Sequence, residues 1–155
     1  MMENESHASQ IGPVQEYYDD KCNNFALVMT ESGDWKNAQQ LFVQVINRRK
    51  KLLGAEHPDT LTSMVNLAST YCNQGRWSEA EQLFVQVMDM RKKLLGAEHP
   101  STLTSMANLA STYCNQGRWN EAEQLEVQVM DMTKKLLGAD HPDTLSSMAN
   151  LAVTY

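Results

Sequence analysis

The stretch that decides the fold is residues 64–71, which read MVNLASTY. It recurs 42 residues later at 106–113 as MANLASTY, and again at 148–155 as MANLAVTY. The surrounding sequence is repeated as closely, because only six positions differ between 57–98 and 99–140. A fixed period in this range is typical of proteins built from stacked copies of one supersecondary unit. We therefore infer that duplication of a single unit produced this chain.

Each unit is predicted to contain two helices. In the second unit, Pro58 suits the first turn of a helix that reaches about Asn73, because the missing N–H costs nothing there. Apolar residues recur along this segment at spacings of three and four, which is the period of one helix face. A second helix is predicted from about Trp77 to Leu95. The turn between the two is short and contains Gly75, so the helices are expected to be antiparallel neighbours.

These elements predict an all-α solenoid of about seven helices in stacked antiparallel pairs. Residues 1–14 are predicted to be a disordered leader, and 15–155 the repeat array. The array is divided into a degenerate first repeat at 15–56, full repeats at 57–98 and 99–140, and the first helix of a truncated fourth repeat at 141–155. In the first repeat, core positions are expected at Cys22, Phe25, Ala26 and Met29.

The composition and net charge indicate which kinds of partner and which cellular compartment to expect. The net charge of -6 argues against nucleic acid or an anionic membrane surface as the main partner. Three cysteines without a secretion-signal pattern fit a reducing compartment, and we predict a cytoplasmic protein. The basic clusters at 48–51, 91–93 and 134–135 are expected in the last turns of helices, where the helix dipole favours cations.

The repeated residues resemble those of the tetratricopeptide repeat family. The family's pattern is matched by Leu67, Ala68, Tyr71, Gly75, Ala80 and Phe84. The period of 42 exceeds the usual 34 residues, and the extra length includes a Leu-Gly-x-x-His-Pro-x-Thr joint. This long form is similar to the repeats of kinesin light chains and of fungal nucleotide-binding immune-receptor-like proteins. The resemblance implies a right-handed superhelix whose first helices line a concave groove that holds a peptide or protein segment.

The face of each first helix opposite its apolar stripe is the predicted ligand groove. It carries one asparagine per unit, and an amide can pair with a peptide backbone of any sequence. The resemblance implies this role as well, while the alternative is a solvated polar face multiplied by duplication. Because the face lacks lysine and arginine, ligands that need a carboxylate clamp are not expected. The candidate ligand-groove residues are Asn24, Thr62, Asn66, Ser69, Asn73, Thr104, Asn108, Ser111, Asn115 and Asn150.

Catalysis and metal binding are not expected. His57, His99 and His141 occur once per unit, so they cannot converge on one ion, and we interpret them as turn residues before a helix. No nucleophile motif is present. The chain is therefore predicted not to be an enzyme and to bind neither a cofactor nor a metal. Glu126 replaces the phenylalanine of the other units, so either it reaches solvent or the third unit is the weakest.

We interpret the chain as a protein–protein interaction module with a scaffold or adaptor role and a protein or peptide partner. One alternative is a self-associating structural solenoid. Homo-oligomers would then form through the open C-terminal face of Met148, Leu151, Ala152 and Tyr155. Another alternative is a fragment of a larger kinesin-light-chain-like adaptor or fungal immune-receptor-like protein.

Overall fold

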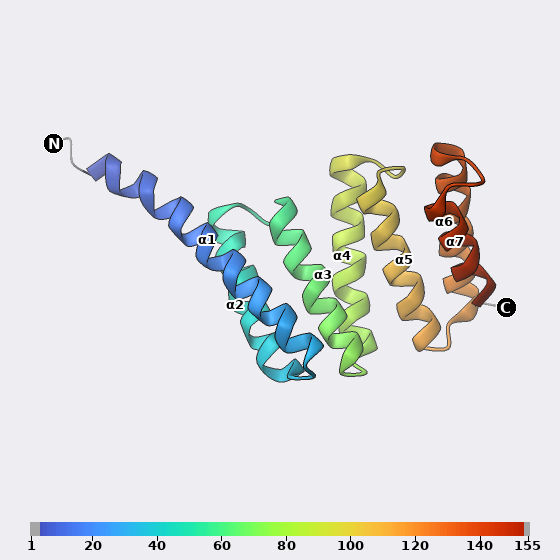
Figure 1. Ribbon diagram of the computed structural model, residues 1–155, viewed down its shortest axis with the longest axis horizontal. Helices are drawn as coiled ribbons and strands as arrows, with labels where there is room; N and C mark the ends of the chain where they lie inside the picture. The colour runs from blue at the N-terminus through green and yellow to red at the C-terminus, as the bar shows by residue number, and fades with distance from the viewer. Residues whose placement is uncertain (1–3, 154–155) are drawn as a thin grey trace. The chain divides into compact units, whose positions relative to one another are not determined.

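The computed structural model describes the backbone of residues 4–153 and the side chains of residues 13–152. These residues form seven α-helices and no strand, and the chain divides into two compact units, Met1–Gly75 and Arg76–Tyr155 (Figure 1). The first unit contains α1 (Asn4–Glu31), α2 (Trp35–Leu52) and α3 (Pro58–Asn73). The second contains α4 (Trp77–Leu95), α5 (Pro100–Asn115), α6 (Trp119–Leu137) and α7 (Pro142–Val153).

The first helix is longer than the sequence predicts. α1 begins at Asn4 and passes through Pro13, so most of the segment expected to be a disordered leader over residues 1–14 is helical. Proline's fixed φ is itself a helical value, but it lacks an N–H donor and its ring crowds the carbonyl four residues earlier, so Pro13 weakens this helix without ending it. Figure 1 shows the N-terminal part of α1 extending past the end of α2. Residues 1–3 lie outside the described part of the chain.

In the first unit, α2 packs against both α1 and α3. Its core contains Ala26 from α1 and Ala38, Phe42 and Val45 from α2, all fully buried. The small alanines allow the two helices to approach closely, as expected from the pattern. Phe25 is an exception to the predicted core, because it is 57% exposed, whereas its repeat equivalent in α3 is buried. The register of the degenerate repeat is therefore kept at the alanine but not at the neighbouring aromatic residue.

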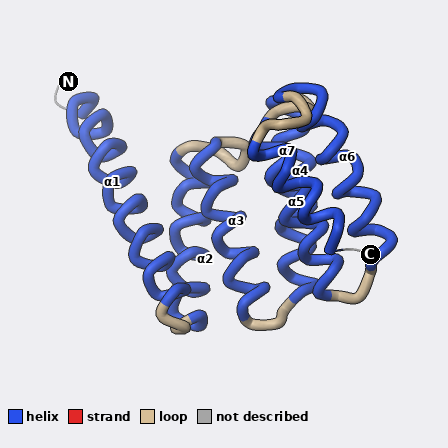
Figure 2. The backbone as a smooth tube through the Cα atoms, turned by 45° about the vertical axis from the view of Figure 1, so that its right-hand side comes forward, coloured by secondary structure: helices blue, strands red, loops and turns tan. Residues whose placement is uncertain are grey.

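In the second unit, consecutive helices pack against each other from α4 to α7. Leu103 and Met106 of α5 and Val129 of α6 form a buried cluster, and further methionines and a leucine from α4 and α6 pack around it. Leu94, an apolar residue near the end of α4, is exposed. Figure 2 shows the short loops that join consecutive helices in each unit.

The joint between repeats is held by its threonine and histidine. Thr60, Thr102 and Thr144 are fully buried, and each donates its hydroxyl to the carbonyl of the preceding repeat's last glycine, at 2.7–2.9 Å. Nδ1 of each repeated histidine accepts the backbone N–H two residues later, at 3.1–3.3 Å. This is an N-cap contact, which satisfies one of the free donors of the helix that follows. The interpretation of the three histidines as turn residues is confirmed.

Glu126 lies inside the third helix pair and does not reach solvent. Its residue is only 4% exposed, and Oε2 has no hydrogen-bond partner. Burial raises the pKa of this carboxyl above its usual range. Cys114 on the adjacent α5 is affected in turn, because burial and the nearby Glu126 both raise the pKa of its thiol. Of the two alternatives for this residue, solvent exposure is wrong.

Candidate functional site

The ten predicted groove residues all lie on first helices. In the first unit α1 carries Asn24, and α3 carries the residues from Thr62 to Asn73. In the second unit α5 carries the residues from Thr104 to Asn115, and α7 carries Asn150. Asn66 and Asn108 are half-buried, and the other eight are exposed. These positions are therefore accessible to a partner on each unit.

Local hydrogen bonds distinguish these residues from one another. The hydroxyls of Thr62, Ser69 and Thr104 each donate to the carbonyl four residues earlier in their own helix, at 2.9–3.1 Å. Nδ2 of Asn115 does the same toward Ser111. By contrast, the side-chain amides of Asn66 and Asn108 have no hydrogen-bond partner among the described residues. A hydroxyl that donates to its own helix can still accept a hydrogen bond from a partner. The exposed faces of the first helices therefore offer both unpaired amides and hydroxyl acceptors.

The second unit contains a groove between α5 and α7, with α6 as its floor. The cavity measures about 450 Å³, which is within the usual range for a ligand site. Its walls are largely apolar and include Leu103, Val129, Leu136 and Leu137. Its polar lining includes Thr104, Thr133, Asp143, Ser146 and Ser147. Of the predicted ligand-groove residues, the structure brings Thr104 into this groove, and Ser146 lies opposite it on α7.

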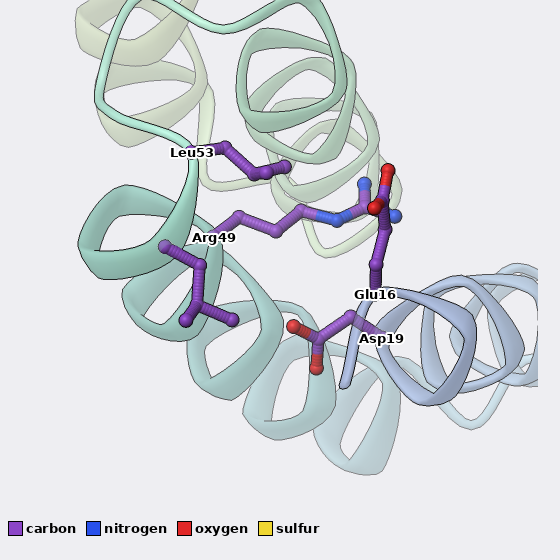
Figure 3. Close-up of a pocket in the computed structure, with 5 residues that line it drawn as sticks. Glu16, Asp19, Arg49 and Leu53 are labelled. Atoms are coloured by element: carbon purple, nitrogen blue, oxygen red, sulfur yellow. The ribbon is translucent and has the colours of Figure 1, made fainter. Parts of the chain in front are cut away.

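The first unit contains a smaller cavity at the equivalent place in the repeat. It measures about 110 Å³ and is lined by Glu16, Asp19, Arg49, Leu52 and Leu53. Each of these residues stands 84 positions, or two repeats, before a residue that lines the groove of the second unit. In Figure 3 the Arg49 side chain extends across this space from α2 toward Glu16 on α1. The same architectural site is therefore largely filled in one unit and open in the other.

Arg49 joins three helices of the first unit. It is 4% exposed, and Nη1 donates to the Asp59 carbonyl at 2.9 Å and to Oγ of Ser63 at 2.7 Å. Nη2 pairs with the Asp20 carboxylate on α1. Oγ of Ser63 also donates to Oδ1 of Asn23 at 3.1 Å. A buried guanidinium is stable only with such partners, and here α1 and α3 supply them.

Arg91 repeats this arrangement in the second unit. Its Nη1 donates to the Ser101 carbonyl at 3.0 Å and to Oγ of Ser105 at 2.9 Å. Burial lowers the pKa of Arg91 from its usual range. The basic clusters lie in the last turns of α2, α4 and α6, as expected. Arg49 and Arg91 have an additional role that was not predicted, because their guanidinium groups bridge helices. The signal in the sequence was the repeated pairing of a late-helix arginine with a serine 14 residues on.

Comparison with known families agrees with this architecture. The model described as "Tetratricopeptide repeat" matches residues 22–93, 63–135 and 108–155. The chain belongs to the tetratricopeptide repeat family. Its matches overlap and together cover both units, so the relationship applies to the whole repeat array. The structure of each unit, with antiparallel helices joined by short loops, is that of tetratricopeptide repeats.

Several solved structures share the fold. Two crystal structures of a candidate kinesin light chain from Podosopora anserina, with nearly identical TPR-like repeats, match at 35% identity and a TM-score of 0.79. The match covers 88% of this chain and 64% of that one, so this chain spans less than two thirds of the length of that relative. The repeats of this chain are thus similar to the TPR-like repeats of that protein. No curated protein matches the chain.

More distant structures share the fold alone. BtubC (BKLC) from P. vanneervenii matches at 20% identity with a TM-score of 0.78, over 97% of this chain and 62% of that one. SycD, a type III secretion translocator chaperone from Yersinia enterocolitica, matches at 12% identity with a TM-score of 0.67, over 94% and 96%. Within residues 4–153, no helix has the length and apolar character needed to span a membrane.

Proposed function

We propose that this tetratricopeptide repeat protein is a scaffold or adaptor, in which the groove between α5 and α7 binds an extended segment of a partner protein. The observation that supports this most strongly is the cavity of about 450 Å³ lined by leucines and a few convergent polar groups. The fold is one that generally mediates protein–protein interaction, and its neighbours include a kinesin-light-chain-like protein and a chaperone. A cytoplasmic location and a non-catalytic role belong to the same proposal.

The groove combines two kinds of contact that a peptide needs. The exposed parts of Leu136 and Leu137 offer apolar surface for side chains, since they are 45% and 44% exposed. Asn108 does not itself line the groove but lies on α5 one helical turn after Thr104, which does. It is half-buried with an unpaired amide, so it offers a donor and an acceptor to the backbone of a segment that continues along α5. Each such hydrogen bond contributes about 0.5–1.5 kcal/mol net. Contacts of this kind give affinity through the backbone and leave sequence preference to the pockets.

The role of the repeated asparagines on the first helices is tested with a peptide selected against the protein from a phage-displayed random library. We expect Asn66→Ala combined with Asn108→Ala, which removes the unpaired amide from whichever unit holds the segment, to weaken binding of this peptide, measured by isothermal titration calorimetry. The helical melt should stay nearly unchanged, because neither amide is bonded within the described structure. Equal affinity of the wild type and the double variant would refute the role of the asparagines.

A second candidate function is self-association through α7. Leu145 is 53% exposed, whereas its repeat equivalents Leu61 and Leu103 are 3% and 5% exposed. Of the face predicted for this contact, Met148 and Leu151 are half-buried, Ala152 is exposed, and residue 155 lies outside the described residues. Stacked repeats bury such surface against a neighbour, and a second copy would supply one.

Light scattering over a range of protein concentrations tests this second function. Self-association predicts a mass that rises with concentration, and Leu145→Asp should abolish the rise because it places a charge on the contact face. Gln128→Asp, at an exposed position of α6, serves as the matched control. A strict monomer at high concentration would exclude self-association.

A further inference from the structure

We propose that the groove of the second unit binds an arginine side chain of the partner segment, at the place that the chain's own arginines occupy in its other repeats. Position 49 and position 91 are arginine, and the third equivalent, position 133, is threonine. Thr133 lines the cavity of about 450 Å³, while Arg49 lines the equivalent cavity of about 110 Å³. The inference rests on the proposed function and adds a specific ligand chemistry to it.

The serine hydroxyl and the backbone carbonyl that hold the internal arginines are both present around the open site. Arg49 and Arg91 each donate to a serine hydroxyl on the next first helix and to the backbone carbonyl four residues before it. The equivalent groups in the open site are Oγ of Ser147 and the carbonyl of Asp143, which lie 2.9 Å apart. Ser147 is buried and donates its own proton to that carbonyl, so its oxygen remains available as an acceptor.

Thr133 only partly replaces the missing guanidinium. Its hydroxyl donates to the Val129 carbonyl of its own helix and lies 3.3 Å from Oγ of Ser147. The Thr133 hydroxyl therefore contacts Ser147, but among the described residues it makes no hydrogen bond to the Asp143 carbonyl. A planar group with several N–H donors would satisfy both acceptors together, as the internal arginines do.

Charge and shape favour arginine over other side chains. The Asp143 carboxylate lies at the groove and is largely exposed, at 3.7 Å from Nδ1 of His141. Arg49 has the Asp20 carboxylate of α1 beside its guanidinium, but the groove position 84 residues after Asp20 is Thr104. In the groove, Asp143 on α7 is therefore the carboxylate that an incoming cation would meet. Neither lysine nor arginine lines the described groove, so no lysine or arginine side chain there would repel an incoming guanidinium. Leu103 and Leu136 can cover the methylene stem of the incoming side chain.

The direct test uses Nα-acetyl-arginine-N-methylamide as the probe, with the citrulline and lysine analogues as matched controls. Backbone amide shifts are followed by NMR on the full chain. We expect saturable shifts at Thr133, Asp143 and Ser147 with the arginine probe. The neutral citrulline analogue should bind at least about tenfold more weakly, because hydrogen bonds to a charged donor are the stronger ones. Equal response to arginine and citrulline, or shifts confined to other helices, would overturn the inference.

A variant that fills the site internally gives an independent measurement. Thr133→Arg restores the residue of the other repeats, so it should abolish the arginine response and raise the melting temperature. Gln128→Arg adds the same charge at an exposed position of α6 and should leave the response unchanged. An undiminished arginine response in folded Thr133→Arg would overturn the inference, and the probe comparison on the wild type decides the matter if that variant does not fold.

The outcomes separate this inference from the proposed function. A library-selected peptide that occupies the groove equally well in the wild type and in Thr133→Arg would contradict the arginine site and leave the proposed function standing. An arginine response at Ser147 without any peptide bound along α5 and α7 would instead contradict the proposed function.

Discussion

At the scale of single residues, the repeat makes each departure from the pattern informative. Phe42 and Phe84 are buried at a position where the third unit has Glu126, and the carboxyl is also buried. Periodicity identified this position as a core site, which the structure confirms. It could not decide whether the longer, flexible glutamate would escape to solvent, because that depends on the packing of α5 and α6 around it.

We predict that Glu126→Phe stabilises the protein. The substitution removes a buried carboxyl oxygen that has no partner and restores an aromatic side chain whose burial contributes roughly 1.5–3 kcal/mol. The melting temperature should rise by several degrees, at about 2–4 °C per kcal/mol for a chain of this size. An unchanged or lower melting temperature in a circular-dichroism melt would count against this placement.

The same residue predicts a pH dependence of stability. The pKa of Glu126 is raised in the folded protein, so below its ordinary pKa both states are protonated and no ionisation penalty exists. As pH rises through the ordinary and then the raised pKa, the unfolded state releases its proton first and the folded state loses stability. Wild type should therefore lose stability relative to Glu126→Gln over this window. Parallel urea-denaturation profiles of the two proteins across that range would contradict the prediction.

At the scale of elements, the sequence was most informative about helices and least informative about the contacts between them. Pro58 and Trp77 begin α3 and α4 as predicted, because proline and glycine act locally. Gly75, with φ of 73°, adopts the left-handed conformation expected after α3. The bridges from Arg49 and Arg91 were not predicted, since a basic residue near a helix end fits the dipole equally well. The part of α1 before Pro13 was not predicted, because a proline signals a helix start but does not exclude a helix before it.

The threonine of the repeat joint gives a prediction about an element boundary. Thr102→Val keeps the shape of a fully buried side chain but leaves the Gly96 carbonyl without its 2.8 Å hydrogen bond. Loss of this bond should cost about 1–3 kcal/mol of unfolding free energy, measured by urea denaturation. Thr104→Val, on the exposed side of the same helix, is the matched control and should change stability by less than about 0.5 kcal/mol. Similar losses of unfolding free energy in both variants would show that the hydrogen bond from Thr102 to the Gly96 carbonyl does not account for the effect.

At the scale of the whole molecule, the family and its type were predictable, and the binding site only in outline. A repeat of 42 residues with the same joint in every unit indicated the long tetratricopeptide form, which the family match and the 35% identical structures confirm. Helical geometry predicted the face that carries Thr104 and Asn108. The exchange of arginine for Thr133 is visible in the sequence. That position 49 lines the smaller cavity and position 133 the larger one could not be predicted, because it depends on where the arginine side chain lies between the helices.

The central claim is that the groove between α5 and α7 holds a protein segment, and blocking this groove tests it most directly. Ser146 lines the groove and is exposed on α7, so Ser146→Trp should fill the groove without disturbing the core. Gln128→Trp, at an exposed site of α6 that does not line the groove, is the control. The affinity of the library-selected peptide should fall at least about tenfold in Ser146→Trp and stay unchanged in Gln128→Trp. Undiminished binding to folded Ser146→Trp, or failure of the library to yield any peptide that binds the wild type, would contradict the claim.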